Sequence, residues 1–271
     1  MRKILLAFDG NHFSEGAFEF ARQLNSSQAV LLIGIFLPDT SSVNQVTTIA
    51  GTVAGFQPRR ANSNTSQQNI QHFQSLCLRH HIECRVHQEP EEYSISILKK
   101  ESRFADLLIL GSESFFVQPG GSKLNGRLKN ALHEVECPVI VVPEKYTFPE
   151  RNVIAYDGSA SSVFAIRQFT YLMPELCQHP TLLLYVRQSK KEILPYEDEI
   201  LELTARHFPN LEVLKVDFDP KIYFTTWISS SKFPILVSGS FGRNPLSTAF
   251  NKSFVQDVLE EHLLPVFISH S

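Results

Sequence analysis

The stretch VIAYDGS at 153–159 repeats the pattern of LLAFDGN at 5–11, and this pairing decides how the rest of the chain is interpreted. Two further pairs of blocks follow in the same order. ADLLILGS at 105–112 is matched by FPILVSGS at 233–240, and CPVIVVP at 137–143 is matched by LPVFISH at 264–270. Three matches in one order indicate that the sequence contains two copies of one unit.

The two copies predict two domains, residues 1–148 and 149–271. The matched aspartates lie 148 residues apart and the matched glycines 128 apart, so the first copy carries about 20 additional residues. The segment 38–68 is rich in Ser, Thr, Asn, Gln and Gly and cannot build a core, so we expect a long mobile loop there. Charge and a proline in EKYTFPER, 144–151, mark the junction between the domains.

Each copy alternates short apolar runs with longer amphipathic stretches. We expect strands at 3–8, 29–36, 82–87, 106–110 and 138–142, and again at 152–156, 181–186, 211–216, 234–238 and 265–269. We expect helices at 13–25, 67–81, 91–103 and 123–134, and again at 160–173, 196–207, 220–231 and 248–262. Runs such as LLIL and VIVV are typical of parallel strands covered by helices on both sides. The pattern therefore predicts an α/β fold of two tandem doubly wound, Rossmann-like domains, each a five-stranded mainly parallel sheet flanked by helices.

The composition argues against several classes of protein. The chain has 271 residues, with 25 basic and 28 acidic side chains and a formal charge of −3, whereas a protein that grips nucleic-acid backbone is usually basic. No apolar run approaches the roughly 18 residues of a membrane span. The four cysteines show no CxxC pairing and are expected to be reduced, mostly buried thiols. We therefore expect a soluble cytoplasmic protein that binds neither nucleic acid nor membrane.

The repeated blocks end strands at positions where an α/β sheet binds ligands, beyond the carboxyl ends of the strands. Asp9-Gly10 and Asp157-Gly158-Ser159 follow first strands, and the GS blocks follow fourth strands. A carboxylate there can accept hydrogen bonds from a ribose hydroxyl or a base amine, and glycine lets backbone N–H groups approach a phosphate. The alternative is that Asp and Ser only cap helices while Gly makes the turn.

The order of a strand ending in DG(S), a later strand ending in GS and a final CPV-type strand resembles the universal stress protein family. The resemblance covers nearly all of both copies and implies that family's adenine nucleotide alpha hydrolase-like fold. In its nucleotide-binding members, the fourth strand is followed by G-x-x-G, nine residues and G-[ST], and these segments hold ATP. Final strands of the family often pair across a two-fold axis, so the resemblance implies that 138–142 and 265–269 pair within this chain as a pseudo-dimer. It makes a homodimer of whole chains plausible as well.

By this resemblance, the second copy has the better preserved site. Gly239-Ser240-Phe241-Gly242 supplies G-x-x-G, and Lys252-Ser253 follows after nine residues, with Lys252 in place of the third glycine. The resemblance implies that Asp157 and Ser159 lie at the adenosine end and that the backbone of Val186 faces the adenine. It also implies that Gly239, Gly242, Lys252 and Ser253 surround the ribose and phosphates. The expected cofactor is ATP or a related adenine nucleotide, with or without Mg.

The first copy departs further from the family pattern. Gly111-Ser112-Glu113-Ser114 lacks the second glycine and adds a carboxylate, which would repel a polyphosphate by about one to a few kcal/mol. Its weaker site residues are Asp9, Ile35, Gly111 and Ser112. We interpret this copy as degenerate for ATP.

Motifs of other enzymes are missing from the sequence: GxSxG, GxxxxGK[ST], GxGxxG and HExxH do not occur. No residue stands out as a general base for water, so we expect no catalytic residue, no metal site and at most slow ATP hydrolysis. The sequence favours a universal stress protein-like regulatory module that binds an adenine nucleotide mainly in the second copy. Two alternatives stay open, a nucleotide-independent stress-response scaffold with degenerated sites and a binder of another small ligand.

Overall fold

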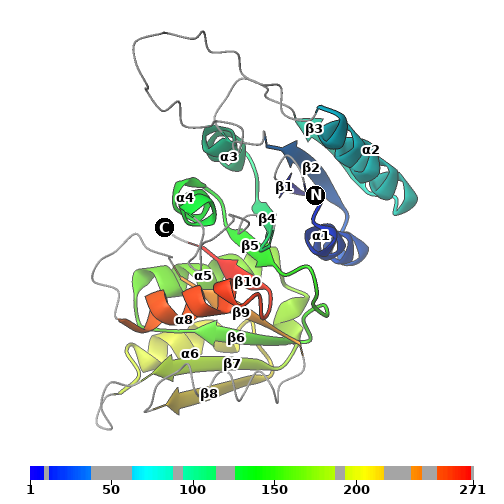
Figure 1. Cartoon of the computed structure of the whole chain (residues 1–271). Helices are drawn as coiled ribbons and strands as arrows, with labels where there is room; N and C mark the ends of the chain where they lie inside the picture. The colour runs from blue at the N-terminus through cyan, green and yellow to red at the C-terminus, as the bar shows by residue number, and fades with distance from the viewer. Residues whose placement is uncertain are drawn as a thin grey trace, which may run out of the picture.

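The structure is a computed structural model that describes residues 1–8, 12–37, 63–87, 94–113, 126–186, 193–216, 233–239 and 249–269. The first half of the chain forms β1 (Arg2–Phe8), α1 (Glu15–Ser27), β2 (Val30–Phe36), α2 (Ser63–Arg79), β3 (Glu83–His87), α3 (Ser94–Ser102), β4 (Leu107–Gly111), α4 (Gly126–Glu134) and β5 (Val139–Val142). The second half forms β6 (Arg151–Ala155), α5 (Ala160–Leu172), η2 (Leu176–Gln178), β7 (Thr181–Val186), α6 (Glu197–Ala205), β8 (Leu211–Val216), β9 (Pro234–Ser238), α8 (Ala249–Glu260) and β10 (Val266–Ile268). Strands and helices alternate as the periodicity predicts (Figure 1). The helix predicted at 220–231 lies outside the described residues.

The described strands form one sheet in the order β3-β2-β1-β4-β5-β10-β9-β6-β7-β8. All pairs are parallel within the N-terminal half, β1–β5, and within the C-terminal half, β6–β10. The halves meet where β5 and β10 pair antiparallel, with Val141 opposite Val266 (Figure 1). This confirms the expected α/β class and the expected pairing of the two final strands within one chain. The division into domains near residue 148 stays a prediction.

Alternate residues of the strands inside the sheet, between the edge strands β3 and β8, enter one of two cores, one on each face of the sheet. In β1, Ile4, Leu6 and Phe8 belong to one core, whereas Leu5 and Ala7 belong to the other. Helices α1, α2, α5 and α6 supply side chains to the first core, and α3, α4 and α8 supply the second. Burial on both faces is the physical reason why these inner strands are mainly apolar, whereas the edge strands β3 and β8 carry charged residues.

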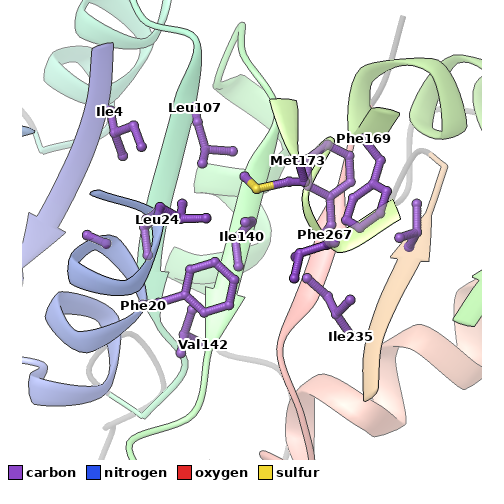
Figure 2. Packing of buried hydrophobic residues seen from close by; sticks show 14 of the residues in the cluster. Ile4, Phe20, Leu24, Leu107, Ile140, Val142, Phe169, Met173, Ile235 and Phe267 are labelled. Carbon is purple, nitrogen blue, oxygen red and sulfur yellow. The ribbon is translucent and has the colours of Figure 1, made fainter. Parts of the chain in front are cut away.

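The first core runs without interruption across the β5–β10 seam. Phe20 of α1 and Ile140 of β5 lie on one side of the seam, and Phe169, Met173 and Phe267 lie on the other (Figure 2). The rings of Phe169 and Phe267 meet edge to face with centroids 5.3 Å apart. The two halves therefore share a hydrophobic core in addition to their backbone hydrogen bonds.

The prediction of a loop over 38–68 is wrong at its C-terminal end, because α2 begins at Ser63. The polar residues from 64 to 68 are exposed or half-buried, so their composition gives no sign of a buried helical face. Ile70, Phe73 and Cys77 are buried at helical spacing and anchor the helix on the sheet. Because helix propagation is easier than nucleation, the anchored part extends back through the polar segment. Residues 38–62 lie outside the described residues.

Candidate functional site at the carboxyl ends of the strands

The candidate site of the C-terminal half lies beside the ends of β6 and β9. In the sheet order, β7 and β8 lie on one side of β6, and β9 and β10 lie on the other, so strand order reverses between β6 and β9. The register places Ala155 opposite Ser238, so both strands end at the same level. The Asp157–Ser159 loop and Gly239 therefore meet at the position where open α/β sheets bind ligands.

Asp157 and Ser159 support the start of α5. The side chain of Ser159 is the N-cap and accepts a hydrogen bond from the backbone N–H of Ser162 at 3.1 Å. Oδ1 of Asp157 accepts one from the backbone N–H of Ser159 at 3.0 Å. Both residues are half-exposed. The capping alternative is thus observed for Ser159, while the half-exposed Asp157 carboxylate lies at the strand end.

Two glycines of this site are required by packing within the chain. Gly158 has φ +77°, and a Cβ there would lie 2.6 Å from Cβ of Pro195. Gly239 is buried, and a Cβ there would lie 2.7 Å from backbone atoms of Ser161 and Ser162. Gly239 therefore allows the end of β9 to approach the first turn of α5, which the sequence pattern alone did not reveal.

The other predicted residues of this site are only partly placed. Val186 is the half-buried last residue of β7 and pairs with Val216. Lys252 and Ser253 are the fourth and fifth residues of α8 (Ala249–Glu260), but their side chains are not among the described ones. Gly242 lies outside the described residues.

In the N-terminal half, side chains of the protein itself occupy the end of β4. The Ser112 hydroxyl donates to Glu113 Oε2 at 2.6 Å, and both Glu113 oxygens lie within 3.1 Å of the backbone N–H of Glu144. Nδ1 of His262, which follows α8, lies 2.7 Å from the Ser112 hydroxyl. Since that hydroxyl donates to Glu113, the His262 ring donates to it in turn. A carboxylate held here, linked across the two halves, opposes an anionic ligand at this end of the sheet.

The strand register shows which residues of the two copies correspond at the end of the second strand, while Ile35 stays a predicted site residue. Ala7 pairs with Ile35, and its matched residue Ala155 pairs with Leu184. Ile35 therefore corresponds to Leu184, and the counterpart of Val186 is Leu37, two residues later. Gly111 ends β4 in a buried position and Ser112 is buried, whereas Asp9 lies outside the described residues.

A cavity between α5 and α6 was not anticipated from the sequence. Its volume is about 550 Å³, and its wall is mainly apolar. Tyr156 lies at its inner end, where burial, followed by the charge of Asp157, raises the pKa of its hydroxyl to about 12. The hydroxyl is therefore protonated and donates to the Pro195 carbonyl at 2.8 Å. The lining residues come from two separate segments, 156–167 and 196–203, so no local motif indicated them.

Among the residues that the structure describes, the cysteines and the acidic and histidine side chains add no further site. All four cysteines are free, and Cys77, Cys137 and Cys177 are buried, as expected for structural thiols. Within the described ranges, no three His, Cys, Asp or Glu side chains are placed to hold a metal ion. None of the described helices has the length and apolar character needed to cross a membrane.

Comparisons with known proteins agree on the fold. No protein-family model matches the chain, and no curated protein matches its sequence. A solved universal stress protein from Archaeoglobus fulgidus DSM 4304 is 15% identical, with a TM-score of 0.60, over 98% of this chain and 96% of that one. A protein from Pseudomonas aeruginosa UCBPP-PA14, named as a candidate universal stress protein, is 12% identical, with a TM-score of 0.58, over 100% and 93%. A protein of unknown function from Pseudomonas aeruginosa PAO1 is 12% identical, with a TM-score of 0.59, over 100% and 92%. The chain therefore has the fold of solved universal stress proteins over nearly its whole length.

Proposed function

We propose that the chain is a stress-response regulatory module of the universal stress protein type that binds ATP or another adenine nucleotide in its C-terminal half. The observation that carries the proposal is that β6 and β9 end at the same register position, where the strand order reverses. This brings the residues that follow the two strands, Asp157 and Gly239, to the same edge of the sheet. The half-exposed Asp157 carboxylate would accept hydrogen bonds from the adenosine end. Lys252 and Ser253, near the start of α8, would meet the phosphates.

The contrast between the halves supports one site rather than two. The Glu113 carboxylate is fixed at the corresponding end of β4 by Ser112 and Glu144. Its negative charge would face a phosphate in the N-terminal half, whereas the C-terminal half has no acidic residue at the position after Gly239-Ser240. With no general base for water in either motif, we propose slow ATP hydrolysis at most.

Thermal unfolding with and without millimolar ATP-Mg, ADP and AMP tests this proposal. A nucleotide at about 100 times its dissociation constant should stabilise the fold by about 2.7 kcal/mol. Gly242→Asp places a carboxylate beside the proposed phosphate position and should abolish the shift. Glu113→Gly should leave the shift unchanged. No shift with any nucleotide would exclude the proposal, and the reverse response of the two variants would move the site to the N-terminal half.

A second candidate function is a nucleotide-independent scaffold. It is favoured by the structural roles of two predicted site residues. Ser159 caps α5 and Gly239 lets β9 pack against the first turn of α5, and neither role needs a ligand. Under this alternative, nucleotides leave the unfolding midpoint unchanged, and the Gly242→Asp protein behaves as the parent does.

A further inference from the structure

The cavity between α5 and α6 adjoins the Asp157–Ser159 loop through Gly158, but its lining includes none of the residues assigned to the nucleotide. One wall is the α5 stripe of Ala160, Val163, Phe164 and Arg167, and the facing wall is the α6 stripe of Tyr196, Glu199, Ile200 and Leu203. Both stripes follow the helical spacing of one face, so each helix presents one continuous side to the cavity. Neither Val186 nor Gly239 lines it. A volume of about 550 Å³ lies within the range of small-molecule pockets, about 300–1,000 Å³.

The inner end of the cavity is fixed by contacts of the loop that precedes α6. The Tyr156 hydroxyl donates a hydrogen bond to the Pro195 carbonyl. The Pro195 ring packs against Gly158, where a Cβ would leave it no room. Leu194 is buried beside them. Tyr196 follows in the left-handed conformation, with φ 50°, and the residue is 67% exposed while it lines the cavity. A bulky residue in that backbone conformation is strained, and an exposed aromatic ring there gains little from the fold itself.

The N-terminal half fills the corresponding space with its own rings. Between α1 and α2, Phe18 and Phe73 meet edge to face at 6.3 Å. Phe13, just before α1, packs against His72 at 4.7 Å. By topology α5 and α6 are the counterparts of α1 and α2, yet the space between them is open. An aromatic group from a ligand would fill this space as the phenylalanine rings fill the space between α1 and α2. Phe164 and Tyr196 are available for contacts with its ring.

Opposite charges face this cavity without neutralising each other. Arg167 lies on the α5 wall and Glu199 on the α6 wall, and both are exposed. Among the described residues, neither side chain forms an ion pair or a side-chain hydrogen bond, and the two do not pair with each other. Charged groups held apart on two walls are complementary to a ligand that carries both signs close together.

We propose that this cavity binds a free aromatic α-amino acid. Its ring lies between Val163, Phe164 and Tyr196, its carboxylate meets the guanidinium of Arg167, and its ammonium meets the carboxylate of Glu199. The apolar wall accounts for the side chain, and the charges of Arg167 and Glu199, which have no partner among the described residues, account for the zwitterion. Binding at this position would bridge α5 and α6.

Isothermal titration calorimetry with L-tryptophan as the probe tests the proposal. Tryptamine lacks the carboxylate, indole-3-propionate lacks the ammonium, and L-alanine lacks the ring. We expect L-tryptophan to bind, each single-charge analogue to bind about tenfold more weakly, and L-alanine to give no heat of binding. Equal affinities for the three indoles, or no binding of L-tryptophan at millimolar concentration, would overturn the proposal.

Variants locate the two charges. Arg167→Gln should weaken L-tryptophan about tenfold and leave tryptamine unchanged, and Glu199→Gln should weaken L-tryptophan while leaving indole-3-propionate unchanged. Val163→Trp should fill the cavity and abolish binding while the protein stays folded by circular dichroism. The matched controls are Glu202→Gln and Arg206→Gln, which change exposed charges on or next to α6 outside the cavity and should retain the parent affinity. Loss of binding in the controls, or retention in Val163→Trp, would contradict the assignment.

Discussion

Replacing Gly239 by alanine tests whether this glycine serves the packing of β9 on α5. The φ angle of Gly239 lies outside the left-handed region, so alanine is compatible with the backbone conformation. The added Cβ would lie 2.7 Å from the carbonyl carbon of Ser161 and the nitrogen of Ser162, whereas ordinary contacts begin at 3.4 Å. These are backbone atoms of the first turn of α5, so no rotamer change relieves the contact. The strand or the helix must move by about 0.7 Å, and overpacking of this kind costs about 1–3 kcal/mol.

Thermal unfolding of Gly239→Ala without ligand measures this cost. A loss of about 2 kcal/mol corresponds to a fall of about 4–8 °C in the unfolding midpoint for a chain of this size. Ser238→Ala is the matched control, because it removes one oxygen at the same buried strand end and adds no atom. An unchanged midpoint in Gly239→Ala would refute the packing argument and leave close approach to a ligand as the reason for a glycine here.

Three other side chains give independent tests. Burial lowers the pKa of Arg2. Its Nη1 donates to the Leu172 carbonyl, whereas Nε and Nη2 have no hydrogen-bond partner among the described residues. We therefore expect the free energy of unfolding of Arg2→Met to lie within about 1 kcal/mol of the parent value, and a loss of several kcal/mol would contradict this. Hydrogen bonds from Arg22 lower the pKa of Glu19 below its ordinary 4.5, so the stability they add is present above that pH and is lost as the pH falls through the lowered value. Glu19→Gln should therefore cost about 0.5 kcal/mol at pH 7 and nothing in acid, as urea titrations at both pH values can show; an equal cost at both would exclude the ion pair as its source. Burial raises the pKa of the Cys137 thiol to about 12, so iodoacetamide at pH 8 should alkylate it only after urea unfolding, and modification in the native protein would contradict its burial.

At the candidate site, the sequence predicted the positions of two residues but not their packing roles. Matched blocks located Asp157 and Gly239, because each follows a strand at a repeated position. Their physical roles needed the structure, since the contact of Gly239 with Ser161 joins segments far apart in the chain. The correspondence of Ile35 with Leu184, two residues before Val186, also needed the structure. Only strand pairing decides which residues stand opposite each other.

The α5–α6 cavity could not be predicted at all. Arg167 and Glu199 lie on different helices, and a helical pattern alone does not say which faces of two helices meet. The start of α2 escaped prediction for a related reason, because its polar first turns are stabilised by a buried anchor that follows them in sequence.

By itself, the sequence determined the alternation of buried strands and amphipathic helices, the two-copy pattern and the positions of the strand ends. These features are local, because apolar runs, glycines and their spacing act within a few neighbouring residues. Only the tertiary structure decided that Glu113 binds Ser112 and Glu144, that His262 reaches across to the other half, and that α5 and α6 leave a cavity open. Such features depend on the simultaneous packing of segments far apart in the chain, which no single stretch of sequence encodes.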